Sequence, residues 1–361
     1  MSSAPEEVTP EKSESELDQY DYELPKDLIA QYPLPQRADS RLLVVNRAEQ
    51  SIEHYHVRDL PEILAPNDRL VLNNTKVLPA RLIGRRDKTE GRWEGLYLES
   101  DEHGLWRMLA KTRGKVSPGE TVTLLGPGDQ DDIQLSLVQQ LPDRTWVGLP
   151  QSEETHLEVL ERVGRIPLPH YIRRGEMIDS DRDRYQTVFA EETGSVAAPT
   201  AGLHFSEGLL DSLAEKGIGR EFVTLHVSLD TFRPITADRL AEHQMHTEWG
   251  QITGEVSECL HETRAAGGRI VAIGTTSVRV LESAAAAGEL QAWQDKTDLF
   301  IRPPYKFKAV DALMTNFHLP RTTLLVLVRA FGGDELIMRA YKEAVESEYR
   351  FYSYGDAMLI L

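Results

Sequence analysis

The chain has 361 residues, 40 Lys and Arg against 58 Asp and Glu, a formal net charge of −18 and a single cysteine. This length exceeds what one hydrophobic core usually supports, so we expect two domains. One thiol can neither close an internal disulfide nor build a cysteine-rich zinc cluster, and the composition fits a reducing, cytoplasmic location. The longest apolar runs, such as residues 324–328, are far shorter than the roughly 20 residues that cross a bilayer. The negative charge argues against nucleic-acid binding by bulk attraction, because phosphate contacts require Lys and Arg.

Acidic residues concentrate at the amino terminus. Residues 1–23 contain eight acids and one base, which sum to −7 and leave −11 for the rest of the chain. A Ser-, Pro- and Glu-rich segment with so little apolar content cannot offset the entropy cost of ordering it. We therefore expect a disordered acidic tail over residues 1–20, and one without the apolar segment of a signal peptide.

The pattern of residues in the next part of the chain predicts a small barrel that is inserted in another domain. Between residues 61 and 150, short and partly alternating apolar segments are separated by Gly, Pro and Asp turns. Strands spaced in this way, without an intervening helical period, are typical of an all-β barrel. The expected barrel strands cover residues 69–72, 80–83, 93–98, 105–109, 121–125, 133–138 and 145–147. The pattern differs on either side, so residues 21–60 and 151–361 are expected to form the second domain.

Helices alternate with strands after residue 150. We expect helices over residues 153–163, 206–217, 255–266, 277–287 and 334–349, and strands over 222–227, 269–273 and 298–301. Together with the buried strand expected at 42–45, this βαβ alternation predicts an α/β domain with a largely parallel sheet.

One strand-to-helix junction is a candidate anion site. The expected strand 269–273 runs into Gly-Thr-Thr-Ser-Val-Arg at 274–279, which contains Thr275, Thr276, Ser277 and Arg279. Free N–H groups and hydroxyls at a helix amino terminus suit a phosphate or a carboxylate, although Ser and Thr there are also good helix caps. The chain has neither a G-x-x-x-x-G-K-[ST] nor a G-x-G-x-x-G motif, which argues against a kinase, an ATPase or an ordinary dehydrogenase.

Histidines mark further candidate sites. His204 ends a loop of small residues at 194–205, where the backbone can approach a ligand closely and a histidine can move protons near neutral pH. A tightly packed turn with a hydrogen-bonded histidine is the alternative. His226 lies at the end of a strand that leads to Asp230.

His246 and Glu248 belong to a third group, which also contains His243. Their spacing could suggest a metal site, but no other ligand cluster is near in the sequence, and we expect no metal. Each of these histidines can equally be a hydrogen-bonded structural group.

Basic residues gather in four short segments, two of which contain a tyrosine. The residues that could contact RNA are Arg85, Arg86, Lys111, Arg113, Arg165, Tyr171, Arg173, Arg174, Tyr305 and Lys306. Cations mixed with aromatic rings suit RNA phosphates and splayed bases, whereas solvated surface charge is the alternative for any one cluster.

Many strings along the chain resemble the S-adenosylmethionine:tRNA ribosyltransferase-isomerase family of the queuosine pathway. The matching segments are residues 22–25, 28–30, 40–42, 73–77, 79–81, 165–169, 171–172, 185–188, 196–205, 223–227, 274–279, 315–320, 349–350 and 353–357. The resemblance covers residues 20–361. It implies an α/β domain of Rossmann-like, three-layer topology interrupted by a β-barrel, in agreement with the pattern of the residues.

The chain also departs from the family pattern. Residues 228–232 read Ser-Leu-Asp-Thr-Phe, where the family usually has G-x-G-T-F, so two glycines beside His226 are replaced. Residues 303–305 are Pro-Pro-Tyr instead of Pro-Gly-aromatic, His170 replaces a proline, and residues 91–93 are Gly-Arg-Trp instead of Gly-Gly-Lys. We still expect the activity to be retained.

The resemblance implies a specific reaction. The ribosyl part of S-adenosylmethionine is joined to 7-aminomethyl-7-deazaguanine at the tRNA wobble position, which gives epoxyqueuosine and releases adenine and methionine. The sulfonium makes the neighbouring 5′ C–H acidic, so a base is needed, and an acid must help adenine leave. We expect no tightly bound cofactor, because the cosubstrate carries its own leaving group.

We assigned roles to matching residues as a hypothesis. Proton transfer falls to His204, His226 and His246, and Glu248 or Asp230 faces the sulfonium. The substrate-binding residues are Thr200, Gly202, Thr275, Thr276, Ser277, Arg279, Asn316 and His318. Of these, residues 275–279 would hold the methionine carboxylate or a phosphate, and Asn316 and His318 would read the base or the adenine.

The expected partners are S-adenosylmethionine and the anticodon loop of a tRNA, with no membrane contact and the protein as a monomer. Two alternatives remain open. A non-catalytic tRNA-binding protein would release no adenine, and a methyltransferase would leave S-adenosylhomocysteine. The glycine-rich loop expected after a methyltransferase's first strand is missing.

Overall fold

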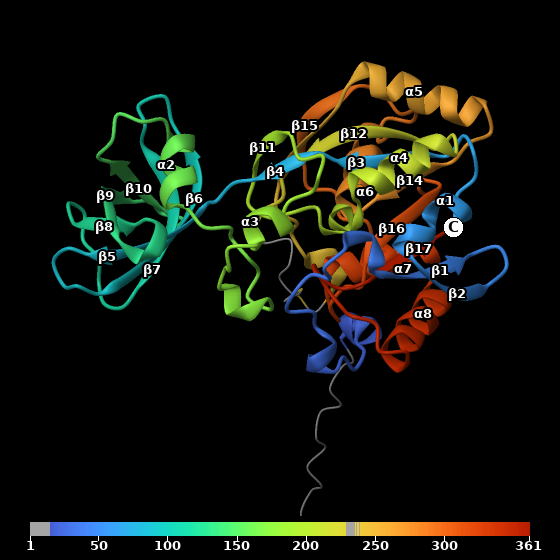
Figure 1. Cartoon of the computed structure of the whole chain (residues 1–361), viewed down its shortest axis with the longest axis horizontal. Coiled ribbons are helices and arrows are strands. Elements are labelled where there is room, and N and C mark those ends of the chain that lie inside the picture. The colour runs from blue at the N-terminus through green and yellow to red at the C-terminus, as the bar shows by residue number, and fades with distance from the viewer. Residues whose placement is uncertain (1–14, 229–234, 236, 238) are drawn as a thin grey trace, which may run out of the picture.

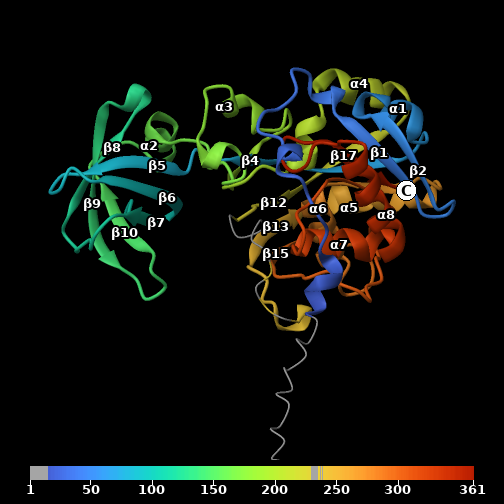
Figure 2. The same ribbon diagram turned by 90° about the horizontal axis from the view of Figure 1, so that it is seen from below.

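The computed structural model describes residues 15–228, 235, 237 and 239–361. Residues 1–14 of the expected tail, and the candidate Asp230, lie outside the described residues. Figures 1 and 2 show a larger α/β domain and a small barrel beside it, joined by extended segments of chain.

The larger domain contains a nine-stranded sheet in the order β15-β13-β12-β3-β14-β16-β17-β1-β2. The strands are β1 (Arg41–Asn46), β2 (Ser51–His56), β3 (Arg69–Asn73), β12 (Gly219–Leu225), β13 (Glu248–Ile252), β14 (Ile270–Ile273), β15 (Trp293–Thr297), β16 (Ala312–Asn316) and β17 (Ala357–Ile360). The middle strands β12, β3, β14 and β16 are parallel to one another. Strand β13 is antiparallel to β12, β15 to β13, β2 to β1, and β17 to β16. The expectation of a largely parallel sheet therefore holds only for the middle strands. Only residues 47–50 separate β1 from β2, and so short a connection permits only antiparallel neighbours.

Helices cover both faces of this sheet. They are α1 (Leu60–Ile63), α4 (Glu207–Glu215), α5 (Gly254–Ala265), α6 (Thr275–Ala284), α7 (Thr323–Gly332) and α8 (Asp334–Glu346), and the short α3 (Asp181–Arg184) lies nearer the barrel. The sequence predicted α4, α5, α6 and α8 but not α7. Residues 298–301, expected as a strand, follow β15 and lie outside it.

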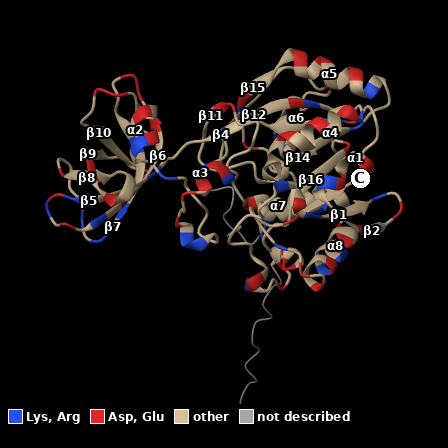
Figure 3. Ribbon diagram, viewed as in Figure 1, with Lys and Arg blue, Asp and Glu red and all other residues tan. Residues whose placement is uncertain are grey.

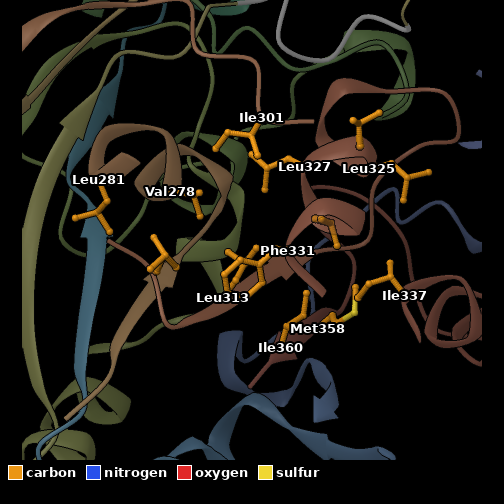
Figure 4. Packing of buried hydrophobic residues seen from close by; sticks show 14 of the residues in the cluster. Val278, Leu281, Ile301, Leu313, Leu325, Leu327, Phe331, Ile337, Met358 and Ile360 are labelled. Carbon is orange, nitrogen blue, oxygen red and sulfur yellow. The ribbon is translucent and has the colours of Figure 1, made fainter. Parts of the chain in front are cut away.

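Alternating side chains on each strand separate two hydrophobic cores. On β1, Leu42 and Val44 pack with α1 and α4, whereas Leu43 and Val45 face the opposite way, toward α5 to α8. Figure 4 shows this second core, in which Leu313 and Met358 from the sheet meet Leu325 and Phe331 from α7. The domain therefore has the expected three layers, helix, sheet and helix.

The smaller domain is a closed barrel in the order β10-β7-β6-β5-β8-β9. Its strands are β5 (Arg81–Arg86), β6 (Arg92–Ser100), β7 (Trp106–Thr112), β8 (Thr121–Leu125), β9 (Asp131–Gln140) and β10 (Trp146–Pro150), and α2 (His156–Val163) packs into the same core through Val159, Leu160 and Val163. Trp93 and Trp106 are fully buried in that core.

The expected barrel boundaries need correction at both ends. Strand β3, within the range 61–150 expected for the barrel, lies between β12 and β14 in the middle of the larger domain's sheet, whereas Leu78 and Ala80 pack into the barrel core. Beyond residue 150, α2 belongs with the barrel. A short apolar strand does not reveal which sheet it joins, since its partners are distant in the sequence. The two domains are linked through β4 (Thr75–Val77), which pairs with β11 (Glu192–Ser195).

The described end of the acidic tail is ordered, contrary to the prediction of disorder up to residue 20. Residues Glu16–Tyr20 form a 3₁₀ helix whose Ser15 side chain accepts a hydrogen bond from Leu17 N. Leu17 and Tyr20 are buried in the core on the α7 side, and the Arg329 guanidinium lies 4.2 Å from the centre of the Tyr20 ring. Two apolar side chains three residues apart share one face of the turn, which offsets the ordering entropy.

No helix in the described part of the chain is both long and apolar enough to span a membrane.

The burial of Tyr20 predicts that this segment stabilises the larger domain. Tyr20→Ala should lower the free energy of unfolding by about 3 kcal/mol, because a large core side chain is lost and a cavity remains. Urea denaturation measures this change, and Glu23→Ala, at an exposed position, is the control. If Tyr20→Ala left the urea midpoint unchanged, residues 15–20 would not be part of the folded domain.

Candidate functional site

A cavity opens where the parallel strands β14 and β16 end. The carboxyl ends of parallel strands meet at one edge of a sheet, which is the usual ligand crevice of an α/β fold. The loops after β14 and β16 form two walls, and the loop before the 3₁₀ helix Thr200–His204 and residues 352–353 complete it. Six of the candidate residues line the cavity: Tyr171, Thr200, Thr275, Thr276, Asn316 and His318.

The amino terminus of α6 faces this cavity. Gly274 turns the chain from β14 into the helix with a φ of 89°, a conformation that a side chain would strain, and no side chain caps the helix. The Thr276 hydroxyl is buried and has no hydrogen-bond partner in the described structure. Ser277, in contrast, donates its hydroxyl to Ile273 O at 2.9 Å. The first turn therefore offers free backbone N–H groups and one unused hydroxyl to an anionic group.

His204 is held by a buried amide. Asn316 Nδ2 lies 3.1 Å from His204 Nε2, and Asn316 Oδ1 accepts a hydrogen bond from Thr200 Oγ1 at 2.9 Å. Burial lowers the pKa of His204 to about 4; Asp356 opposes this shift, and Arg350 and Arg37 add to it. The ring is therefore neutral at pH 7. Its Nε2 accepts from the amide, which places the ring proton on Nδ1.

His318 is a second neutral histidine, and it lines the cavity itself, which His204 does not. Its Nε2 lies 2.9 Å from Thr315 Oγ1, and its backbone N–H donates to the Tyr341 hydroxyl at 3.0 Å. Burial lowers the pKa of His318 to about 3. The ring therefore offers a hydrogen-bonding edge to a ligand without carrying charge.

His226 lies beside the cavity, whose lining includes its neighbour Val227. Its ring stacks on Trp249 with centroids 5.1 Å apart, and its Nδ1 lies 2.8 Å from Thr75 Oγ1. Gly194 covers the ring, since a Cβ at that position would come within 2.7 Å of Nε2. Burial lowers the pKa of His226 as well. The ring is therefore held in place by Trp249, Thr75 and Gly194.

Glu248 and Arg279, assigned separate roles from the sequence, contact each other. Their side chains form an ion pair that is 1% and 4% exposed, respectively. Glu248 also accepts a hydrogen bond from Ser228 N at 2.7 Å, and Arg279 donates to Thr297 O at 3.2 Å. Buried charges are tolerated when they are paired and hydrogen-bonded in this way. The pair joins β13 to α6, and neither residue lines the cavity.

Two other candidates also lie outside the cavity lining. His246 is exposed, and its proximity adds to the burial that lowers the pKa of His243. Gly202 is buried, and a Cβ there would meet Phe189 and Thr187 at 2.9 Å. Its role is close packing behind Thr200.

Apart from Tyr171, the candidate RNA-contacting residues fall into two groups; Figure 3 shows how Lys and Arg are distributed along the ribbon. Some are engaged within the protein: Arg86 with Glu120, Arg173 with Asp181, Arg85 with Glu90 and Asp131, Arg165 with Asp129, and Tyr305 with Glu282. Lys111, Arg113, Arg174 and Lys306 are exposed. Because an engaged arginine must exchange one partner for another, the exposed four are the better contacts for phosphates.

A groove of about 1280 Å³ runs between barrel strands β6 and β7 and residues 167–171. Lys111 and His170 lie along it, and Tyr171 lines both this groove and the cavity. Tyr171 donates to or accepts from Ser353 Oγ at 2.7 Å, and its ring lies 4.4 Å from that of Tyr352. The sequence analysis did not select Tyr352, whose φ of 73° is unusual for a residue other than glycine.

Within the described residues, no three His, Cys, Asp or Glu side chains are grouped closely enough to hold a metal ion.

The two buried histidines predict a pH dependence of stability. Their folded pKa values lie below the roughly 6.5 of an unfolded histidine, so only the unfolded chain binds these protons as the pH falls. The free energy of unfolding should therefore drop by about 2 kcal/mol between pH 7 and pH 5.5, where carboxylates contribute little. His204→Gln should show about half this slope in urea denaturation, and an unchanged slope would contradict a neutral His204.

Comparison with known proteins identifies the family. A sequence family described as queuosine biosynthesis protein matches residues 17–360. S-adenosylmethionine:tRNA ribosyltransferase-isomerases from Symbiobacterium thermophilum and Trichlorobacter lovleyi are 48% and 46% identical, over 96% and 95% of this chain and 99% of each relative. The crystal structure of an S-adenosylmethionine tRNA ribosyltransferase from Thermotoga maritima matches with a TM-score of 0.54 at 39% identity, covering 95% of this chain and 100% of that one. The chain therefore belongs to the queuosine biosynthesis protein family, together with the S-adenosylmethionine:tRNA ribosyltransferase-isomerases.

Proposed function

We propose that this protein transfers and isomerises the ribosyl moiety of S-adenosylmethionine onto 7-aminomethyl-7-deazaguanine at the wobble position of a tRNA. The product is epoxyqueuosine-tRNA, and adenine and methionine are released. The family and its full-length relatives support this function. The observation that carries it is the cavity that brings the uncapped amino terminus of α6 together with Asn316 and the neutral His318.

The methionine carboxylate is the group that suits the α6 terminus. It would accept from the first-turn N–H groups and from the Thr276 hydroxyl, which has no partner of its own. Arg279 is paired with Glu248, so it would hold α6 in position and would not contact the methionine carboxylate directly. Thr275 lines the same wall and would contact the amino-acid part of the cosubstrate.

The opposite wall would hold the nucleoside part. The amide of Asn316 is already hydrogen-bonded to His204, to Thr200 and to the carbonyl of Tyr352. We therefore assign Asn316 to positioning His204 and not to reading a base. His318 is available to contact the adenine or the deazaguanine. His204 and His226 are both neutral, and His204 could take up a proton from the acidic 5′ C–H at Nε2 once the hydrogen bond from Asn316 is released.

The anticodon loop would enter along the groove between the barrel and residues 167–171. Unpaired bases of a loop can be splayed and stacked on aromatic rings, and Tyr171 stands where the groove meets the cavity. Lys111, on the barrel side, would contact a phosphate. We place this activity in the cytoplasm and expect the protein to act as a monomer.

One assay tests the proposed function. The protein is incubated with tRNA carrying 7-aminomethyl-7-deazaguanine and labelled S-adenosylmethionine, and the small products are identified. Adenine with methionine supports the proposal. S-adenosylhomocysteine would instead reveal a methyltransferase, and RNA binding without either product would reveal a non-catalytic tRNA-binding protein.

The histidine assignments predict a loss of rate. His204→Ala and His226→Ala should each slow adenine release by at least about 100-fold, the usual contribution of a positioned acid or base. His103→Ala, in an exposed turn of the barrel, should retain the parental rate. Adenine release at the parental rate in both site variants would rule the assignments out.

The carboxylate assignment predicts a binding defect. Thr276→Val keeps the shape of the side chain but removes the hydroxyl, so KM for S-adenosylmethionine should rise about tenfold, the value of one hydrogen bond to a charged group. The turnover number should change little. Thr89→Val, in an exposed barrel turn, is the matched control. An unchanged KM for Thr276→Val would place the carboxylate elsewhere.

A further inference from the structure

A second cavity lies beside His204, and its lining contains no residue of the α6 terminus. Arg37, Ser40, Arg184 and His204 line it, and Ser353 lines both this cavity and the main one. The sequence analysis assigned no role to Arg37 or Arg184. We call this space the rear cavity.

Both arginines of the rear cavity are held by backbone carbonyl groups. Arg37 donates to the carbonyl oxygens of Leu203, Asp183 and Gln186 at 3.0, 2.8 and 2.9 Å. Arg184 donates from its two terminal nitrogens to the carbonyl oxygens of residues 34 and 35 at 2.6 and 2.9 Å. Its Nε is buried and has no hydrogen-bond partner in the described structure. The two guanidinium groups are therefore rigidly placed before any ligand arrives.

Their charges lack the compensation that other partly buried arginines have. Arg86 pairs with Glu120, Arg173 with Asp181, and Arg279 with Glu248. Among the described residues, no carboxylate lies within ion-pair distance of Arg37 or Arg184. Burial lowers the pKa of Arg37, and the nearby charge of Arg184 lowers it further, whereas Tyr354 and Asp183 oppose the shift. Two like charges in a partly desolvated space favour an anion between them.

We propose that the rear cavity is an oxyanion site that takes a phosphate group. Preorganised guanidinium groups bind phosphate well, because their N–H geometry matches the oxygens and little side-chain entropy is lost on binding. The Ser40 hydroxyl can add one donor from the opposite side.

The phosphate we assign is a phosphodiester of the RNA substrate, and this part rests on the proposed function. Arg37 also lines a third, open cavity of about 1000 Å³, together with Lys76 and Arg182. Arg37 and Lys76 would offer cations to a polyanion lying across these cavities, whereas Arg182 is paired with Glu161, and Asp183 also lines the third cavity. A phosphate in the rear cavity would anchor the RNA backbone beside His204 and leave the main cavity for the nucleoside and the cosubstrate.

The first test uses inorganic phosphate and the full chain. Isothermal titration at constant ionic strength, with chloride as the balancing anion, gives the dissociation constant. Arg184→Gln should raise it at least tenfold, and Arg184→Lys should recover part of the loss. Arg339→Gln is the matched control, because that exposed arginine of α8 also donates to a backbone carbonyl, that of Gln50. Thermal melting of each variant reports whether the fold is kept.

The second test identifies the source of the phosphate. The affinity for an anticodon stem-loop is measured between roughly 50 and 200 mM salt, and loss of one phosphate contact should reduce the slope of log K against log salt by about 0.7 to 0.9. A reduced slope in Arg184→Gln, but not in Arg339→Gln, supports the RNA assignment. If Arg184→Gln weakened the binding of phosphate but left the salt slope of stem-loop binding unchanged, the rear cavity would be an oxyanion site for free phosphate. The assignment of an RNA phosphodiester to it would then be overturned.

Equal phosphate affinity in the parent and in Arg184→Gln would overturn the whole inference. Failure of the parent to bind the stem-loop would count against the proposed function, and the phosphate titration would still decide whether the rear cavity is an oxyanion site.

Discussion

The parallel pairing of β3, β14 and β16 is the constraint on which the arrangement of this protein depends. Parallel neighbours bring their carboxyl ends to one edge of the sheet, so three connections that are distant in sequence start at the same place. The connection after β14 becomes the α6 terminus, and the one after β16 carries Asn316 and His318. The connection after β3 leads through β4 into the barrel. The site and the second domain are neighbours for this topological reason.

Burial then determines which charges the site can use. His204 and His318 are neutral because the protein removes them from water, whereas the buried side chains of Glu248 and Arg279 form an ion pair with each other. The same rule leaves Arg37 and Arg184 as exceptions, since backbone carbonyl groups orient them but no carboxylate of the described residues lies within ion-pair distance of them. The main cavity is thus a largely uncharged pocket with one helix terminus, whereas the rear cavity is cationic.

The overall charge of −18 gives little information on the choice of partner. Lys111, Arg113, Arg174 and Lys306 are exposed, whereas other arginines of the same short segments are engaged with carboxylates of their own domain (Figure 3). An electrostatic footprint for RNA depends on which cations remain on one face, and that distribution is a property of the folded surface.

Local sequence patterns determined much of this protein. The α/β class, the inserted barrel, the cap of α4 by Ser206 and the strand-to-helix junction at 274–279 all follow from periodicity, capping and turn residues, which act over a few positions. The candidates Thr200, Thr276, Asn316 and His318 came from matching strings, and the fold brings them to one cavity.

Only the tertiary structure determined which residues of the chain contact one another. It assigned β3 to the sheet instead of the barrel, ordered Leu17 and Tyr20 on the core and paired Glu248 with Arg279. Among the residues that the structure describes, it left Arg37 and Arg184 without a carboxylate within ion-pair distance. These outcomes depend on contacts between residues tens to hundreds of positions apart, whose energies come from desolvation and close packing. A local pattern contains no information on them, because it does not specify which surfaces will be buried against each other.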